Sequence, residues 1–153
     1  MVEKYCSFFG HRDFVEDDNI SAKIKNIISD CVSNKNIYNF LLGGYGHFDY
    51  CCAKYINELK SNYPEIRIYL VLAYINKKLD QYDKNFIQTM YDDILYPPIE
   101  KTPLKYSIVK RNEWMVENSQ FVIFYVNKTW GGASKMLEYT QKKKIKFINV
   151  ADI

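Results

Sequence analysis

Short runs of β-branched and aromatic residues alternate along this chain with longer segments in which apolar residues recur every three or four positions. A short apolar run is typical of a buried strand, and a period of 3.6 residues is typical of an amphipathic helix. Their regular alternation predicts an α/β fold: a three-layer sandwich in which a mostly parallel central sheet carries helices on both faces.

The element boundaries follow from the same pattern. Strands are predicted over Tyr5–Phe9, Ile37–Leu42, Ile66–Tyr74, Phe121–Val126 and Lys146–Val150. Helices are predicted over Asp18–Ser33, from Phe48 to the residue before Pro64, over Leu104–Asn118 and over Ala133–Lys143. Between Asn76 and Pro103 the periodicity weakens, and we expect one short helix over Lys84–Met90 followed by an irregular segment. No repeat or linker interrupts the chain, so residues 1–153 are expected to form one domain.

Length and composition exclude several classes of protein. With 153 residues, 48% of them hydrophobic, the chain can bury a sizeable core without the help of disulfides or metals. Its apolar runs fall far short of the ~20 residues that a membrane-spanning helix requires. Glu3 stands where a signal peptide has basic residues. We therefore expect a cytoplasmic protein that does not associate with membranes.

The cysteines, histidines and net charge give no sign of a metal site or a nucleic-acid partner. Cys6, Cys31, Cys51 and Cys52 contain no C-x-x-C pair, and neither histidine has a partner at a spacing typical of metal ligands. Reduced, buried thiols are therefore expected, with neither a metal nor another cofactor. A net charge of +3, from 21 basic and 18 acidic residues, is too balanced to indicate nucleic-acid binding, which we consider an unlikely function.

Glycine placement is the main indication of a ligand site. The chain has six glycines, and each follows a predicted strand and precedes a helix: Gly10, then Gly43, Gly44 and Gly46, then Gly131 and Gly132. In a parallel sheet these junctions share one edge, outside the carboxyl ends of the strands, where ligands bind. Backbone without Cβ lets a ligand approach closely, and helix amino termini attract anions. The pattern favours a phosphate-bearing ligand, although short strand-to-helix turns need glycine for structural reasons alone.

Polar residues beside these glycines are candidate ligand contacts. His11 and Arg12 directly follow Gly10, and Asp49 lies early in the second helix. Each also has a structural interpretation, since His11 suits a turn and an acid such as Asp49 is favoured near a helix amino terminus.

Arg111 shares an apolar helix stripe with Ile108 and Met115. A guanidinium that faces the core must find a partner, which is either a buried carboxylate or an anionic ligand. Asn112 beside it is a further hydrogen-bonding candidate.

Glu138 lies in the last helix, four residues after Ser134 and below the Gly131-Gly132 turn. A carboxylate at that place could bind ribose hydroxyls or stabilise positive charge that develops on a sugar ring. In isolation, a solvated helix face is the favoured interpretation of Glu138.

Taken together, several segments resemble the SLOG superfamily, the Rossmann-like group that includes the LOG phosphoribohydrolases and the DprA-type domains. Within that group the chain is most similar to the small-protein branch represented by YpsA, which carries Gly-His-Arg after the first strand. The segments that carry the resemblance are Phe9–Asp13, Gly43–Asp49, Tyr96–Glu100, Arg111-Asn112 with Met115, and Trp130–Ala133.

The resemblance implies a Rossmann-like fold and assigns roles to individual residues. Arg111 matches the arginine of the LOG enzymes, and Gly131, Gly132 and Glu138 match their two glycines and glutamate in spacing. Trp130, Ser134, Lys135 and Asn112 replace the LOG proline, third glycine, threonine and lysine. These departures favour nucleotide binding over the LOG reaction.

The resemblance and the residues together predict one site. Arg111 and Glu138 are its expected catalytic residues if it is an enzyme. The expected ligand-binding residues are Gly10, His11, Arg12, Gly43, Gly44, Gly46, Asp49, Asn112, Gly131, Gly132 and Ser134.

Three functions remain open from the sequence. The first is a domain that binds or senses a nucleotide or a nucleotide-derived small molecule. The second is a LOG-like phosphoribohydrolase that cleaves a nucleoside 5′-monophosphate to base and ribose 5-phosphate. The third is a protein-interaction domain whose glycines only form turns. Relatives of this kind commonly dimerise, so a homodimer is also expected.

Overall fold

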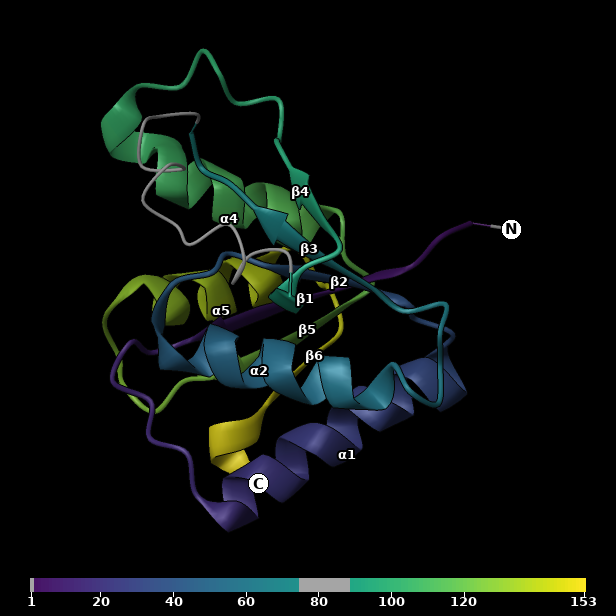
Figure 1. Cartoon of the computed structure of the whole chain (residues 1–153). Helices are drawn as coiled ribbons and strands as arrows, with labels where there is room; N and C mark the ends of the chain where they lie inside the picture. The colour runs from purple at the N-terminus through teal and green to yellow at the C-terminus, as the bar shows by residue number, and fades with distance from the viewer. Residues whose placement is uncertain (1, 75–88) are drawn as a thin grey trace.

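A six-stranded sheet forms the centre of the computed structural model, which describes residues 2–74 and 89–153 (Figure 1). Its strands lie in the order β4-β3-β2-β1-β5-β6, and every neighbouring pair is parallel. The strands are β1 (Tyr5–Gly10), β2 (Asn39–Leu42), β3 (Arg67–Val71), β4 (Asp93–Leu95), β5 (Phe121–Tyr125) and β6 (Phe147–Asn149). The predicted α/β class is confirmed.

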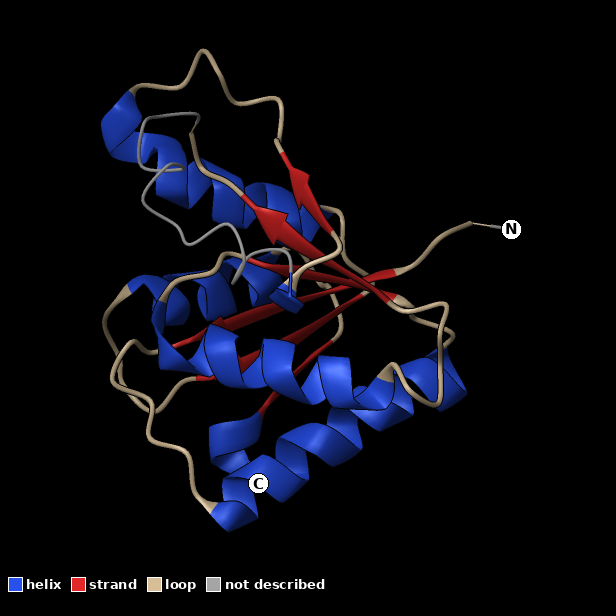
Figure 2. Cartoon of the chain, viewed as in Figure 1, coloured by secondary structure: helices blue, strands red, loops and turns tan. Residues whose placement is uncertain are grey.

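Helices cover both faces of this sheet (Figure 2). The helices α1 (Asp18–Lys35) and α2 (Gly46–Leu59) pack on one face, and α4 (Ser107–Glu117) and α5 (Gly132–Lys142) pack on the other. Two short 3-10 helices, η2 (Leu104–Tyr106) and η3 (Val150–Asp152), precede α4 and follow β6. None of the described helices is both long and apolar enough to span a bilayer.

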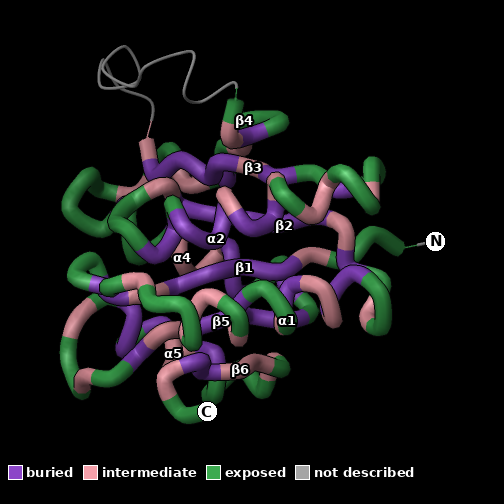
Figure 3. The backbone as a smooth tube through the Cα atoms, turned by 60° about the horizontal axis from the view of Figure 1, so that its bottom comes forward, coloured by how far each residue is buried: buried purple, intermediate pink, exposed green. Residues whose placement is uncertain are grey.

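Alternate side chains of each central strand enter opposite cores. Phe8 of β1 packs under α1 and α2, whereas the next residue, Phe9, packs under α4 and α5. Leu41 and Leu42 of β2 divide between the cores in the same way. A parallel sheet that is covered on both faces needs apolar residues at nearly every strand position, which explains the continuous apolar runs in the sequence. Figure 3 shows β1 buried along most of its length between β2 and β5.

Local sequence sets the ends of α1. The Asp17 side chain caps its amino terminus by accepting a hydrogen bond from the Ile20 N–H at 2.8 Å. Asn36 ends the helix in the left-handed conformation, and the Ile37 N–H then donates to the Cys31 carbonyl at 3.0 Å. Because the Ile37 N–H is used in this bond at the helix end, it does not pair with a neighbouring strand. The strand β2 therefore begins at Asn39 and not at the predicted Ile37.

The strand β4 lies in a segment that was predicted to be irregular, so that prediction was wrong. Asp92 precedes it, and its Oδ2 accepts a hydrogen bond from the Ile68 N–H at 2.8 Å. Its Oδ1 lies 2.6 Å from Lys60 Nζ. These bonds hold a short, charged strand at the edge of the sheet, where acidic residues are tolerated and discourage pairing with another chain.

Other boundaries also differ from the prediction by a few residues. The strand β3 ends at Val71, short of Tyr74, and the predicted helix from Leu104 starts as η2 before α4 begins at Ser107. The final strand stops at Asn149 because η3 follows directly. Most of the helix expected over Lys84–Met90 lies outside the described residues.

Candidate functional site

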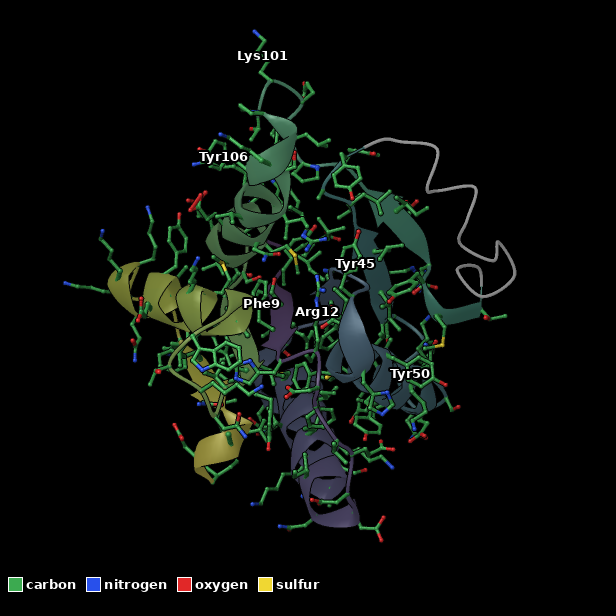
Figure 4. All side chains as sticks on the ribbon, turned by 90° about the vertical axis from the view of Figure 1, so that its left-hand side faces the viewer. Phe9, Arg12, Tyr45, Tyr50, Lys101 and Tyr106 are labelled. Atoms are coloured by element: carbon green, nitrogen blue, oxygen red, sulfur yellow. The ribbon has the colours of Figure 1, made fainter. Side chains whose placement is uncertain are left out.

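A cavity of about 480 Å³ opens at the carboxyl-terminal edge of the sheet. It lies beside the ends of β1 and β5. The chain adds β2, β3 and β4 on one side of β1 and then β5 and β6 on the other, so the strand order reverses between β1 and β5. Such a change in direction leaves a crevice between diverging connections, which is the usual ligand site of open α/β sheets. Figure 4 looks onto this edge and shows Phe9, Arg12 and Tyr45 grouped between α5 and α2.

Four segments enclose the cavity: the loop after β1, the loop after β2, the first turns of α4, and the loop that leads into α5. The predicted site residues that line it are Gly10, His11, Arg12, Gly43, Asp49, Arg111, Asn112, Gly131 and Gly132. Glycines from three separated junctions therefore meet at one hollow. Which of these residues bind a ligand stays a prediction.

The amino terminus of α5 opens into this cavity. Gly131 caps the helix with φ 101°, a conformation that other residues rarely adopt, and among the described residues no side chain makes a capping hydrogen bond there. A Cβ added at Gly131 or Gly132 would meet nothing within 4 Å, so both glycines border open space. The helix end thus offers backbone donors and the positive end of its dipole to an anion.

The amino terminus of α2 is occupied by an acid of the chain itself. The Asp49 carboxylate is buried and accepts a hydrogen bond from the Gly44 N–H at 3.1 Å. Burial raises the pKa of Asp49 to about 7, against the opposing effects of Arg111 and of the backbone donors Tyr45, Gly44 and Gly43. Of the two helix ends near the cavity, the one at α5 is therefore the better site for a ligand anion.

Arg111 reaches from α4 across the carboxyl ends of β2 and β3. Its side chain is 4% exposed, and Nη1 donates to the carbonyls of Gly43 and Val71, both at 3.3 Å. Nε donates to the Asn112 side chain at 2.9 Å, and the guanidinium lies over the Tyr45 ring, 5.5 Å from its centroid. The sequence predicted a buried carboxylate or an anionic ligand as the partner of this arginine. The structure shows hydrogen bonds to the backbone of two strand ends, and Arg111 acts on the buried Asp49 carboxyl group by charge.

His11 is held as a neutral imidazole. Its Nε2 accepts a hydrogen bond from the Asn127 N–H at 3.2 Å, which connects the loop after β1 to the loop after β5. Burial lowers the pKa of His11, and the positive charge of Lys128 lowers it further. The neutral tautomer carries its proton on Nδ1.

Three side chains that sequence analysis did not select form the rim on the α5 side. Lys128 Nζ lies 2.6 Å from Asp13 Oδ2 and sits over the Trp130 ring, 4.8 Å from its centroid. This ion pair lowers the pKa of Asp13. Trp130 is 67% exposed, so its indole presents an aromatic face beside the cavity.

The residues that sequence analysis missed are Phe8, Phe9, Asp13, Tyr45, Ile108, Lys128, Trp130 and Ala133. Most of them adjoin a residue that was selected. Tyr45 stands between Gly44 and Gly46, and Trp130 directly precedes Gly131. Selecting the direct sequence neighbours of the glycines would have identified these two aromatic residues.

Four predicted residues are not among those that line the cavity. Gly44 and Gly46 belong to the turn before α2, where they face the Leu70 side chain and the Arg12 backbone. Ser134 is buried, and its hydroxyl lies 2.6 Å from the Lys128 carbonyl and 3.1 Å from that of Trp130. This serine therefore shapes the loop before α5.

Glu138 points away from the cavity. It is exposed on α5, and it follows the buried Met136 by two residues, a separation that places it on the opposite side of a helix. The spacing from Ser134 suggested a shared face, but Ser134 is buried whereas Glu138 is exposed. Glu138 is not among the residues that line the cavity, and its contact with a ligand stays a prediction.

Comparison with known proteins identifies the fold. A scan against protein-family models finds no match, and a search of curated proteins finds no similar sequence. Among solved structures, the chain resembles DNA processing protein A from Helicobacter pylori, which binds single-stranded DNA. The two share 16% sequence identity with a TM-score of 0.63, and the likeness covers 94% of this chain and 63% of the H. pylori chain.

Two further structures are similar over nearly the whole chain. The protein TM1055 matches at 10% identity and a TM-score of 0.57, over 94% of this chain and 72% of that one. The Moco carrier protein of Chlamydomonas rheinhardtii matches at 11% identity and a TM-score of 0.53, over 99% of this chain and 77% of that one.

These likenesses define the class: a Rossmann-like α/β domain with a crevice at the carboxyl ends of its parallel strands. The Rossmann-like fold that the sequence resemblance implied is therefore confirmed.

Proposed function

We propose that the chain binds a nucleotide or a nucleotide-derived small molecule in this cavity, with a phosphate at the amino terminus of α5. The observation that carries the proposal is the uncapped α5 terminus, which borders open space inside a hollow of about 480 Å³. That volume lies within the range of about 300–1,000 Å³ that small-molecule sites occupy.

Charged side chains support a phosphate at this end of the cavity. Arg12 and Lys128 both line it, from the loops after β1 and β5. Lys128 is paired with Asp13, whose side chain is 68% exposed. An incoming phosphate would compete with that exposed carboxylate for the ammonium group at little cost, because exposed ion pairs are weak.

Aromatic side chains from two different loops around the cavity support a planar base. Tyr45 and Trp130 are 38% and 67% exposed, and both line the cavity. Stacking of a base on an aromatic ring contributes about 1–3 kcal/mol and tolerates different bases.

The positions of the carboxyl groups favour binding over hydrolysis. Glu138, the carboxylate expected to act on the ribose, lies outside the cavity. The carboxyl groups that line it are those of Asp13 and Asp49, and both already bond to groups of the chain, Lys128 and the Gly44 N–H. The position of Glu138 therefore does not support a phosphoribohydrolase activity.

A binding panel tests the proposal. Thermal unfolding is measured with nucleoside monophosphates, cyclic nucleotides, ADP-ribose and a short single-stranded DNA, which is included because the H. pylori protein binds such DNA. At 100 times its Kd, a ligand stabilises the fold by about 2.7 kcal/mol, a rise in Tm of roughly 5–10 °C for a domain of this size.

Three other results of the binding panel would each favour a different function. A shift with single-stranded DNA and with none of the small nucleotides would mean a nucleic-acid partner. Free base released from a nucleoside monophosphate on chromatography would mean an N-glycosidase. No shift with any member of the panel would leave the glycine loops with a structural role only.

The homodimer also remains a proposal. Exposed apolar side chains gather on η2 and the first turn of α4, where Leu104, Tyr106 and Val109 are 69%, 50% and 41% exposed. Sedimentation equilibrium at micromolar concentration tests it, and a mass near 18.2 kDa would exclude the dimer at that concentration.

A further inference from the structure

A cluster of potential metal ligands lies outside the residues that line the cavity, where the loop before α1 meets α2. Glu16 from the loop between β1 and α1 approaches His47 and Cys51 of α2. One ligand atom of each residue lies within 4.8 Å of the others. No metal was expected from the sequence, because the chain has no C-x-x-C pair and neither histidine was judged to have a partner at a metal-ligand spacing.

We propose that Glu16, His47 and Cys51 bind a divalent transition-metal ion, with zinc as the preferred metal. His47 and Cys51 are four residues apart and therefore share one helix face. Their ligand atoms, Nε2 and Sγ, are 3.4 Å apart. Two ligands at zinc bond lengths of about 2.0–2.3 Å lie about 3.4–3.7 Å apart when the geometry is tetrahedral. The two helical ligands are thus already spaced as a shared metal requires.

The ligand set selects the class of metal. A thiolate, an imidazole and a carboxylate together suit zinc and its neighbours, whereas magnesium and calcium require oxygen ligands throughout. Three protein ligands leave a fourth tetrahedral position, and the exposure of His47 gives solvent access to it. Binding converts the Cys51 thiol to a thiolate and releases its proton to solvent.

Neighbouring groups already orient the carboxylate. The Tyr55 hydroxyl donates a hydrogen bond to Glu16 Oε2, and Lys54 Nζ lies 3.4 Å from the same oxygen. The tyrosine is the kind of outer partner that fixes the direction of a metal-binding carboxylate. Lys54 is the cation that a metal would displace, and its 39% exposed side chain is free to turn into solvent.

The site would link two structural elements. Glu16 follows the loop that carries His11, Arg12 and Asp13 into the cavity, and the other two ligands belong to α2. A bound ion would therefore fasten the cavity-lining loop to the helix, and would stabilise the fold by mass action.

Cobalt(II) is the probe for the experiment, because a cobalt–thiolate bond gives an intense charge-transfer band and a tetrahedral site gives strong visible bands. Reduced, metal-free protein is titrated with cobalt chloride, and zinc chloride is then added. We expect saturation at one equivalent, bleaching of both sets of bands by zinc, and a higher Tm with either metal.

Variants assign the ligands. Cys51→Ala should abolish the charge-transfer band, and His47→Ala, a change at an exposed position, should abolish saturation at one equivalent. Tyr55→Phe should weaken cobalt binding about 10–100-fold, and Lys54→Gln should strengthen it. Cys52→Ala is the matched control, because Cys52 is buried beside Cys51 but is not in the cluster.

Two results would overturn the proposal. One is the absence of thiolate bands at millimolar cobalt in the folded wild-type protein. The other is a site that persists in His47→Ala or is lost in a folded Cys52→Ala variant. If Cys51→Ala does not fold, the His47→Ala result alone decides.

Discussion

The Asp49 carboxyl group accepts a hydrogen bond from the backbone N–H of Gly44, five residues earlier, and so fills the amino-terminal end of α2 with a side chain from its own first turn. In an α/β crevice that position commonly attracts a ligand anion. Because Asp49 already occupies the α2 terminus, the α5 terminus is the one of the two that remains open. A phosphate is therefore expected at α5.

This buried acid predicts an unusual pH dependence of stability. Its folded pKa of about 7 exceeds the unfolded value of 3.8, so between these pH values the folded state binds more protons than the unfolded state. The free energy of unfolding should therefore fall as pH rises from about 4 to 7, by an amount on the order of 3 kcal/mol, and then level off. Urea denaturation of the wild type and Asp49→Asn across this range measures it. Equal slopes in the two proteins would contradict the assignment.

Replacing Arg111 with Met should destabilise the fold. The change removes two hydrogen bonds to strand-end carbonyls and the positive charge beside Asp49, and we expect a loss of about 2–4 kcal/mol in the free energy of unfolding. The double variant with Asp49→Asn should lose less than the sum of the single changes, by about 1 kcal/mol or more. Strictly additive losses would show that the two side chains do not interact.

Gly132→Glu tests the anion site directly. A Cβ at this position meets nothing within 4 Å, and an acid in the first turn suits the helix dipole, so the protein should fold as well as the wild type. The new carboxylate would occupy the place proposed for the phosphate, and binding of the nucleotide found in the panel should weaken at least tenfold in calorimetry. Glu138→Gln on the same helix is the control and should bind normally. If Glu138→Gln instead loses binding, Glu138 would have to belong to the ligand site.

Gly10→Ala should lower stability because of close packing. A Cβ at Gly10 would lie 2.3 Å from Cγ of Phe48, a fully buried ring of α2. The forced displacement should cost about 1–3 kcal/mol, seen as a lower midpoint of chemical denaturation. The companion change Gly132→Ala, which meets no neighbouring atom, should be nearly neutral.

The general architecture was predictable from sequence because buried parallel strands leave continuous apolar runs. Phe121–Val126 illustrates this, since four of the five residues of β5 are buried. The convergence of the glycine clusters was predictable for a related reason: the carboxyl ends of parallel strands share one edge. By contrast, β4 has only three residues and begins at the second of two adjacent acids, so its pairing depends on Ile68 and Lys60, far away in sequence.

Side-chain direction was less predictable than position along the chain. Arg111 was correctly expected to face the interior, because Met115, four residues later, is fully buried. Glu138 lies on the exposed face that its sequence position alone favoured, and its role beside a ligand came only from the resemblance. The approach of Glu16 to Cys51 depends on how a loop folds back over α2, which no local period encodes.

The exposure of Trp130 provides an optical reporter of the crevice. The chain has two tryptophans, and the other, Trp114, packs against the core beneath α4 and α5. Changes in red-edge emission, which arises from water-exposed indoles, will thus come mainly from Trp130. Occupancy of the cavity can accordingly be followed without a label, and a Trp130→Phe protein supplies the background signal.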